Sequence, residues 1–306
     1  MKGRFAPSPT GRMHLGNIYS ALLAWLSARS QDGGFILRIE DIDRQRSRDE
    51  YAVQIDADLR WLGIDWDERY VQSRRFTYYE DHLKRLNDMG LVYPCYCSRA
   101  DIMATQAPHE SDGRVVYKGT CRPENLPHDF MPSRPGALRL RVPDSDISFV
   151  DGHYGEHSVN LSRQCGDFIL RRADGAWAYQ LAVVVDDALM GVTEIVRGSD
   201  LLLSVPQQMY LYGLFGYETP SYCHLPLLCN AEGQRLSKRD KSLDMSVLRD
   251  NYRPEELTGL LAYYAGITDR PEGISARELI PLFSWRNVPV GNIRLCSLPT
   301  DISLSR

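Results

Sequence analysis

Long apolar segments are missing from this 306-residue chain, and its first residues do not lead us to expect a secretory leader. No run approaches the roughly 18–20 apolar residues that span a membrane. The N-terminal sequence MKGRFAPSPTG has no apolar segment after its basic residues, which a secretory signal would require. Low-complexity tracts and internal repeats are also missing. We therefore expect a cytoplasmic protein outside the membrane, long enough for about two domains.

The chain also lacks an excess of basic residues, since its formal net charge is −4. This excludes a protein that coats nucleic acid through bulk charge, but it leaves room for a local basic face. Short basic clusters do occur, and each is either a solvated surface or part of such a face. They are Arg44, Arg46 and Arg48; Arg74 and Arg75; Arg171 and Arg172; and Lys238, Arg239 and Lys241.

A disulfide framework is not expected, because seven cysteines is an odd number in a chain without an export signal. One residue separates Cys95 from Cys97, and Cys121 follows after a gap of 23 residues. Three such thiols suit a structural zinc ion, which takes four ligands, although free thiols are an alternative. The spacing leaves the fourth ligand open among Tyr117, His109 and His128. Buried apolar positions are expected for the remaining cysteines, Cys165, Cys223, Cys229 and Cys296.

The most informative stretch that is present covers residues 4–19, RFAPSPTGRMHLGNIY. A short apolar step at Phe5 and Ala6 leads into a turn rich in proline and glycine, and a helical pattern follows. Helix N-termini present free N–H groups and the positive end of a dipole, which suit phosphate. His14 can donate to a phosphate oxygen, and Gly16 lets an adenine ring approach the backbone. The alternative is a helix-capping histidine beside a turn glycine.

Strand and helix patterns alternate through residues 1–90. Strands are predicted over 4–6 and 35–39, and helices over 17–29, 48–62 and 78–89. This alternation predicts a parallel sheet with helices outside it. Ligands in such folds bind beyond the C-terminal ends of the strands. Both the turn after residue 6 and the acidic stretch that starts at Glu40 fall at such ends.

The helical period is lost after residue 90. Residues 91–165 are therefore predicted to form an insertion, mainly antiparallel, which carries the three closely spaced cysteines. Its strands are expected over 137–142 and 147–150.

The parallel pattern is predicted to return near Phe168. Strands are expected over 182–186 and 194–196, with a turn or short helix over 187–190 and a helix over 201–215. Only helices are expected after Leu243, over 246–250, 254–264 and 276–283. The predicted division of the chain is 1–90, 91–165, 166–240 and 241–306.

Two groups of polar residues suggest a site. A turn at 230–233 precedes RLSKRD, where Lys238 on a loop would stabilise charge at a phosphate under attack; a solvated basic loop is the alternative. Arginines bind carboxylates through two prongs, and a carboxylate can hold an ammonium group. Residues at strand ends would suit an amino acid with an acidic side chain, unless they are surface salt bridges or a core tyrosine: Arg4, Ser8, Glu40, Tyr179 and Arg197.

Taken together, these segments resemble the catalytic half of class I aminoacyl-tRNA synthetases, and most closely the glutamyl-tRNA synthetases. APSPTGRMHLGN resembles the HIGH region of that family, and RLSKRD resembles its KMSKS loop with Lys238 at the second lysine. LRIEDIDRQRSRDE, YQLAVVVDD and EIVRGSDLL resemble segments at the same relative positions. The resemblance covers about residues 5–283. It implies a Rossmann-like α/β catalytic domain with an inserted acceptor-type subdomain.

Two departures narrow the resemblance. The chain ends near residue 306, with no room for the anticodon-binding domain of ordinary glutamyl-tRNA synthetases, and only a short helical C-terminal region is expected. Val183 stands where the family usually has an asparagine near the bound amino acid. With the CxC…YxxxC pattern, these departures make the chain similar to the truncated paralogues, the glutamyl-queuosine tRNA(Asp) synthetases. Similar paralogues bind zinc through three cysteines and a tyrosine, a spacing that Tyr117 matches.

The resemblance implies ATP-dependent activation of glutamate and its transfer to the queuosine base of tRNA(Asp), by a monomer that uses ATP with Mg²⁺ and holds a structural zinc ion. His14 and Lys238 are then catalytic. The implied glutamate site is Arg4, Ala6, Ser8, Glu40, Tyr179 and Arg197. The implied ATP site is His14, Gly16, Asn17, Leu236, Ser237 and Lys238. The implied zinc ligands are Cys95, Cys97, Tyr117 and Cys121.

Three alternatives remain open from the sequence. One is a truncated glutamyl-tRNA synthetase that charges a tRNA acceptor end. Another is a nucleotidyltransferase with a similar nucleotide site, which would not need the carboxylate-binding residues. The third is a zinc-bearing RNA-binding module without activity, which both intact signature loops disfavour.

Overall fold

A computed structural model describes residues 1–104, 116–236 and 243–295. Its first sheet is parallel and contains β1 (Lys2–Phe5), β2 (Gly34–Ile39) and β3 (Glu68–Val71), in that order. α1 (Leu15–Arg29) connects β1 to β2, and α2 (Asp49–Trp61) connects β2 to β3. The predicted alternation of strand and helix in the first part of the chain is confirmed, and so is the parallel sheet.

A second sheet continues the first. Its order is β7 (Gly155–Asn160), β6 (Asp146–Asp151), β10 (Ser221–Leu225), β9 (Glu194–Gly198). β10 pairs in parallel with both β9 and β6, while β6 and β7 form an antiparallel hairpin. β9 lies beside β1, because the Thr193 amide donates to the Lys2 carbonyl at 2.9 Å and Arg4 donates to the Val196 carbonyl. The C-terminal ends of β1, β2 and β9 therefore face the same space.

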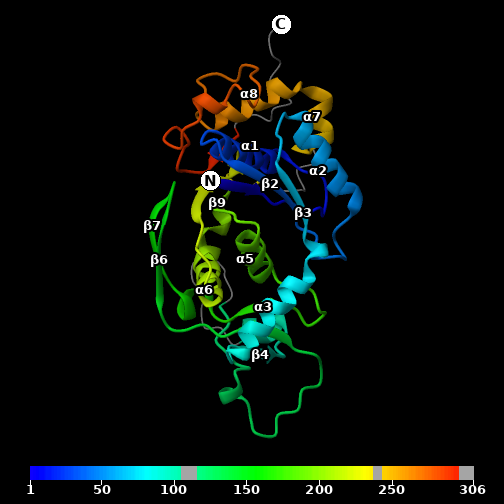
Figure 1. Cartoon of the computed structure of the whole chain (residues 1–306), viewed down its shortest axis with the longest axis vertical. Coiled ribbons are helices and arrows are strands. Elements are labelled where there is room, and N and C mark those ends of the chain that lie inside the picture. Colours follow the sequence, from blue (N-terminus) through cyan, green and yellow to red (C-terminus); the bar gives the residue numbers. More distant parts are fainter. Residues whose placement is uncertain (105–115, 237–242, 296–306) are drawn as a thin grey trace.

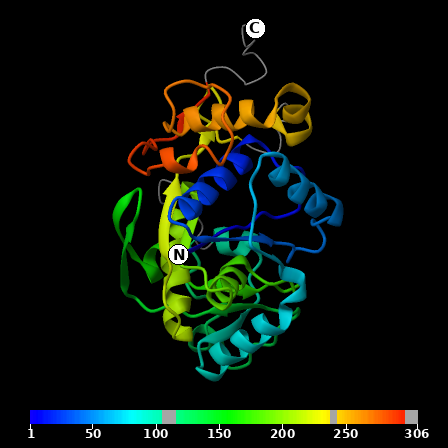
Figure 2. The same ribbon diagram turned by 45° about the horizontal axis from the view of Figure 1, so that its top comes forward.

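α1 lies at the centre of the largest core. It is buried around most of its circumference, from Leu15 to Ala28. Side chains of α7 (Met245–Asn251) and α8 (Pro254–Tyr264) belong to the same core cluster. Figures 1 and 2 show these two helices packed over the α1 side of the molecule. α1 is thus enclosed between the sheet and the helices that follow residue 243.

The predicted strand over 182–186 is wrong, whereas the short helix offered as one alternative for 187–190 is confirmed for 187–189, as the end of a longer helix. Residues 182–189 belong to α5 (Tyr179–Leu189), which packs with α3 (Phe76–Asp88) and α6 (Val205–Phe215). α5 is buried on all sides from Leu181 to Asp187. A short apolar run that is buried all round has no polar face to reveal a helical period, and its three valines favour a strand reading.

The predicted helix over 201–215 divides into two parts. A 3₁₀ segment, η4 (Ser199–Ser204), precedes α6, and Pro206 lies in the first turn of α6, where a missing N–H costs nothing. Gly216 ends the helix with a φ of 70°, a left-handed conformation that favours glycine.

A smaller antiparallel sheet contains β4 (Val92–Cys95), β5 (Ala137–Leu140) and β8 (Phe168–Arg171), next to α4 (Arg99–Ala104). Antiparallel pairing after residue 91 is therefore confirmed. The predicted return to parallel pairing at Phe168 is wrong, because β8 pairs antiparallel with β5. The strand predicted over 147–150 is β6, and it joins the main sheet through β10. Local patterns do not encode which distant strand becomes a partner.

The region after residue 243 contains α7 and α8 close to their predicted bounds. The helix predicted over 276–283 is only a 3₁₀ turn, η6 (Ile280–Leu282). The prediction of helices alone is also wrong, since β12 (Ile293–Arg294) pairs with β11 (Leu228–Cys229). Two-residue strands are too short for any period to show. The other short helical turns are η1 (Gln72–Arg74), η2 (Pro123–Asn125) and the π-type turn η3 (Leu161–Cys165).

Within the described ranges, none of the helices combines the length and apolar character needed to cross a membrane. The division of the chain at residues 90, 165 and 240 stays a prediction.

Candidate active site

A cavity of about 460 Å³ opens at the C-terminal ends of β1, β2 and β9. Every described residue of the predicted glutamate and ATP sites lines it. Ser237 and Lys238 lie outside the described residues. The predicted residues on the cavity wall are Arg4, Ala6, Ser8, His14, Gly16, Asn17, Glu40, Tyr179, Arg197 and Leu236.

His14 caps the N-terminus of α1. Its Nδ1 accepts a hydrogen bond from the Gly16 amide at 3.1 Å, and its own amide donates to Asn17 Oδ1 at 3.1 Å. Because Nδ1 accepts, the proton of the neutral ring lies on Nε2. A Cβ atom at residue 16 would lie only 3.0 Å from His14 Cε1, so a larger residue there would crowd the imidazole ring. The capping role and a place on the cavity wall thus occur together.

The opposite part of the cavity, which we call the arginine end, is formed by Arg4, Glu40, Tyr179 and Arg197. Arg4 Nη1 donates to the Val196 carbonyl at 3.1 Å, which ties β1 to β9 at the cavity wall. Arg197 Nη1 lies 3.4 Å from the Tyr179 hydroxyl, and its Nη2 donates to the Leu201 carbonyl at 3.2 Å. The two guanidinium groups are buried yet line the cavity.

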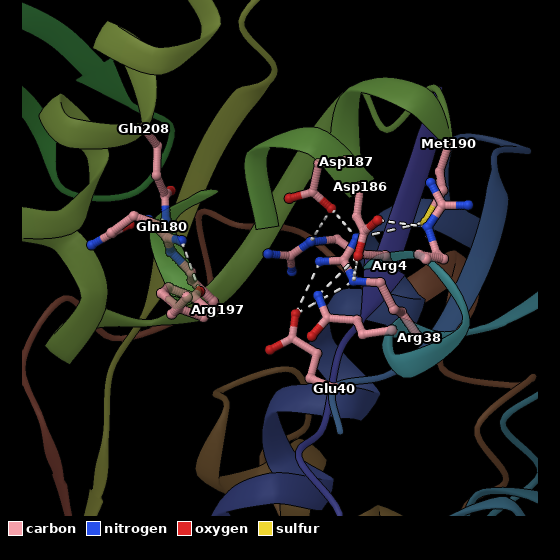
Figure 3. A network of polar contacts seen from close by, with 12 residues as sticks. Arg4, Arg38, Glu40, Gln180, Asp186, Asp187, Met190, Arg197 and Gln208 are labelled. Carbon is pink, nitrogen blue, oxygen red and sulfur yellow. Dashed lines mark hydrogen bonds and ion pairs between the residues drawn. The ribbon is translucent and has the colours of Figure 1, made fainter. Parts of the chain in front are cut away.

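Beneath the arginine end, Arg38 is completely buried and joins two acidic residues (Figure 3). Its Nη1 donates to Asp187 Oδ1 at 2.5 Å, and its Nη2 donates to Glu40 Oε1 at 3.1 Å. Arg4 Nε lies 3.5 Å from the same Asp187 oxygen. Burial raises the pKa of Glu40, while Arg38 and Arg4 oppose that rise. Two arginines and two carboxylates therefore balance one another, as buried charges require.

Asp186 connects this network to α3. It accepts hydrogen bonds from Gln72 Nε2 at 2.9 Å, Arg75 Nε at 2.6 Å and the Tyr79 hydroxyl at 2.7 Å. Burial and the neighbouring Asp186 carboxylate raise the pKa of Tyr79. Arg75 is thus part of the buried polar network. The alternative that the cluster at Arg74 and Arg75 is only a solvated surface is therefore wrong for Arg75.

Sequence reasoning missed Arg38, Asp186 and Asp187. Each interrupts a segment that is otherwise apolar, Arg38 in the strand FILRI and the two aspartates after LAVVV. Charged residues are rarely buried unless they are paired. A charged residue inside an apolar segment was therefore a signal for a buried ion pair. It did not show which residue would be the partner.

Val183 lies in α5, one turn after Tyr179, and is almost fully buried in the core. It is not among the residues that line the cavity. At this position, where the resemblance implies an asparagine, the chain thus places an apolar side chain in the core and off the cavity wall.

The three predicted cysteines form a cluster with Tyr117 beside the smaller antiparallel sheet, where Cys95 ends β4. The Sγ atoms of Cys95, Cys97 and Cys121 all lie within 4.8 Å of one another. Sulfurs bound to one tetrahedral zinc would be about 3.8 Å apart, given Zn–S bonds of about 2.3 Å. The Cys121 amide donates to the Tyr117 hydroxyl at 2.6 Å, which places that oxygen beside the sulfurs. His128 is exposed and outside this group, and His109 lies outside the described residues.

Known sequences match this chain along nearly its whole length. A family model described as "tRNA synthetases class I (E and Q), catalytic domain" matches residues 1–291. A glutamyl-Q tRNA(Asp) synthetase of Symbiobacterium thermophilum is 48% identical over 309 aligned residues, which cover 96% of this chain and 95% of the relative. Another, from Nitratidesulfovibrio vulgaris, is 45% identical and covers 99% of this chain and 97% of its own length.

The fold matches solved structures of a related enzyme. The glutamate-tRNA synthetase of Elizabethkingia anophelis superposes with a TM-score of 0.82 at 29% sequence identity, over 97% of this chain and 68% of that one. A glutamate tRNA ligase of Elizabethkingia meningosepticum gives a TM-score of 0.80 at 29% identity, over 96% of this chain and 66% of that one. The chain therefore belongs to the class I tRNA synthetases of the E and Q group, and within it to the family of the glutamyl-Q tRNA(Asp) synthetases.

Proposed function

We propose that this protein activates L-glutamate with ATP to form glutamyl-adenylate, and then transfers the glutamyl group to the queuosine base of tRNA(Asp). One observation carries this proposal. A cavity with a helix N-terminus and His14 at one side has two buried arginines, Arg4 and Arg197, at the other. A single ligand-sized space thus offers donors for a phosphate and for carboxylates. The relatives named above carry the same activity in their names.

In the first step, a glutamate α-carboxylate oxygen attacks the α-phosphorus of ATP, and pyrophosphate leaves. His14 and Lys238 stabilise the charge that develops on the phosphates. Gly16 and Asn17 at the start of α1, with Leu236 and Ser237, surround the nucleotide. Bound Mg²⁺ would neutralise phosphate charge in the same region.

Glutamate is held at the arginine end. Arg4 and Arg197 bind its two carboxylates, since a guanidinium offers paired donors to a carboxylate. Glu40 faces the ammonium group, and Ala6, Ser8 and the Tyr179 hydroxyl complete the polar wall. Because Glu40 is already paired with Arg38, its carboxylate is fixed before the substrate arrives.

In the second step, a hydroxyl of the modified base attacks the adenylate carbonyl and AMP leaves. No dedicated general base is assigned, because an acyl-adenylate is reactive enough to do without one. The base must leave its stack to reach the cavity, as a nucleotide in a single-stranded loop can.

The cysteine cluster is proposed to hold a structural zinc ion through Cys95, Cys97, Tyr117 and Cys121. Three thiols and a phenol converge there, which is a donor set that zinc selects. The ion would cross-link the loops that carry these residues.

The proposal is tested by incubating the protein with labelled glutamate, ATP and tRNA with or without queuosine. Label should appear on tRNA that contains queuosine, on the modified base. Label on the terminal adenosine would instead favour a truncated glutamyl-tRNA synthetase. Lys238→Ala should slow glutamate-dependent pyrophosphate exchange by about a hundredfold or more, the loss typical of one charge-stabilising group. An unchanged rate would contradict the role given to this loop.

A further inference from the structure

We propose that Asp151 and His224 are positioning residues, which fix the orientation of the Arg197 guanidinium so that it can receive a substrate carboxylate. Neither residue lines the cavity, so neither would contact the substrate. The inference rests on the proposed function, because it takes Arg197 to be a glutamate ligand.

The three residues lie on three neighbouring strands. Asp151 ends β6, His224 lies in β10 and Arg197 lies in β9. His224 is directly opposite Arg197 in the β10–β9 register, and Asp151 is opposite Tyr222, two residues before His224. The sheet itself therefore brings the carboxylate, the imidazole and the guanidinium into one row.

The row is closely connected by hydrogen bonds. His224 Nδ1 lies 2.6 Å from Asp151 Oδ2, and Arg197 Nε lies 3.0 Å from His224 Nε2. The exposed fractions are 2% for Asp151, 0% for His224 and 6% for Arg197. Water therefore cannot substitute for any of these contacts without entering the core.

The chemistry of the groups determines the direction of each hydrogen bond. A guanidinium only donates, so His224 Nε2 must accept and carries no proton. The ring proton is then on Nδ1, where it donates to Asp151. Burial lowers the pKa of His224, which favours this neutral ring. Hydrogen bonds from His224 and from backbone amides hold the pKa of Asp151 low although burial opposes it, so its carboxylate stays charged.

Asp151 is itself held in place. Its Oδ1 accepts from the amides of His153 at 3.0 Å and Tyr154 at 2.9 Å, and the His224 amide donates to both of its oxygens at 3.2 Å. An anchored carboxylate fixes the imidazole, and the imidazole fixes the guanidinium.

The consequence for Arg197 follows from its donors. A guanidinium has five N–H groups, and three are used by His224, Tyr179 and the Leu201 carbonyl. One N–H remains on each terminal nitrogen, and this pair is what a carboxylate takes in a two-pronged contact. The ring of Tyr222 lies 5.3 Å from Arg197 Cζ and restricts the guanidinium from another side. Figure 3 shows Arg197 apart from the cluster around Arg38, so it needs an anchor of its own.

Two variants of His224 separate its two contacts. The amide of His224→Gln can reach the position of Nε2 and accept from Arg197. The shorter His224→Asn can reach only the position of Nδ1, and it leaves Arg197 Nε without an acceptor. We expect His224→Asn to raise the glutamate KM in pyrophosphate exchange by about ten- to a hundredfold, since a guanidinium that is not held in place must be ordered when the carboxylate binds. His224→Gln should stay within about threefold, and the ATP KM and kcat should change little in both.

Asp151→Asn provides an independent test. Three backbone amides require an acceptor at the position of Oδ1, so the new NH₂ group would face His224 Nδ1. That nitrogen would then accept, and the ring proton would move to Nε2, facing the Arg197 donor. A wrong tautomer of this kind strongly impairs a catalytic triad when its aspartate becomes asparagine. The glutamate KM should rise by at least about tenfold, with retained ATP affinity.

Equal glutamate KM values for the unmodified protein and His224→Asn would overturn the proposal, as would a fall in kcat without a change in KM. If these variants do not fold, the imidazole ¹⁵N shifts of the unmodified protein decide the matter. A neutral His224 with its proton on Nδ1 is expected, and a charged ring or the opposite tautomer would contradict it. In every one of these outcomes the unmodified protein still exchanges pyrophosphate with glutamate; loss of that exchange would overturn the proposed function instead.

Discussion

The arginine end of the cavity and the cysteine cluster differ in how they are stabilised. At the arginine end, positive and negative groups from distant parts of the chain pair with each other, as Arg38 does with Asp187 across 149 positions. The cysteine cluster takes its donors from residues 95–121, where three thiols lie within 4.8 Å of one another beside the Tyr117 hydroxyl. The first site is held by the protein's own ion pairs, whereas the second offers donors that a cation would satisfy.

This difference shows two ways to prepare a polar site inside a protein. Paired charges on packed strands and helices are rigid before a substrate arrives, which reduces the cost of ordering the site on binding. A set of metal ligands gains part of its order from the metal when it binds, because metal binding and local folding are coupled. Substitutions among the paired charges should therefore lower the stability of the whole protein. The stability contributed by the cysteine cluster should depend on whether metal is bound.

The largest expected effect comes from Arg38→Met. Removing this guanidinium leaves Asp187 and Glu40 buried without their main partner, and breaking such a network costs about 3–5 kcal/mol of the free energy of unfolding. Urea titration measures the loss. Arg46→Ala removes an exposed pair with Asp43 and serves as the control, with a change below about 0.5 kcal/mol. Similar urea midpoints for the two variants would show that the ion pairs of Arg38 do not stabilise the arginine end.

Metal removal tests the other region. A strong chelator should lower the thermal midpoint by about 5 °C, the shift that a loss of about 2 kcal/mol produces in a large domain. Added zinc should restore the midpoint. Tyr117→Phe keeps the ring and removes only the oxygen, so it should bind zinc more weakly yet retain it. A chelator-treated sample that is free of metal and melts unchanged would show that the cluster, too, is held by the protein alone.

Arg197→Lys should have a smaller effect, limited to the substrate. A lysine cannot reproduce the two-pronged contact, so the glutamate KM should rise by about tenfold, which corresponds to about 1.4 kcal/mol. Pyrophosphate exchange at varied glutamate measures this, with the ATP KM as the internal control. A normal glutamate KM would mean that the arginine end does not use this residue.

The smallest effect is a dependence of stability on pH. Burial lowers the pKa of His82 and of His224 below the ordinary 6.5. The unfolded chain therefore binds these protons more readily than the folded protein does. The stability that the neutral rings contribute is fully present above pH 6.5 and is lost as the pH falls toward their pKa values in the folded protein. The slope should not exceed about 1.4 kcal/mol per pH unit for each histidine. Urea titrations from pH 7.5 to 5.5 measure it, and His224→Gln should flatten the curve; an unchanged slope would argue against a neutral His224.

Much of the first half could be predicted, because its elements have clear periods. α1, α2 and α3 and the strands β1 and β2 begin and end within a few residues of their predicted bounds. The predicted cavity residues also came together, since strand ends in a parallel sheet meet at one edge. α5 was mistaken for a strand because complete burial removes the polar face that would have revealed its period.

The sequence by itself determined the alternation of strand and helix, the two signature segments of the family and the spacing of Cys95, Cys97 and Cys121. All of these are local, so residues within a few turns carry the full signal. Only the tertiary structure decided that β6 joins β10, that Asp151 reaches His224 and through it Arg197, and that Arg38 pairs with Asp187. The physical reason is that a hydrogen bond or ion pair requires a partner within about 3 Å, and the chain does not record locally which distant residue will be there.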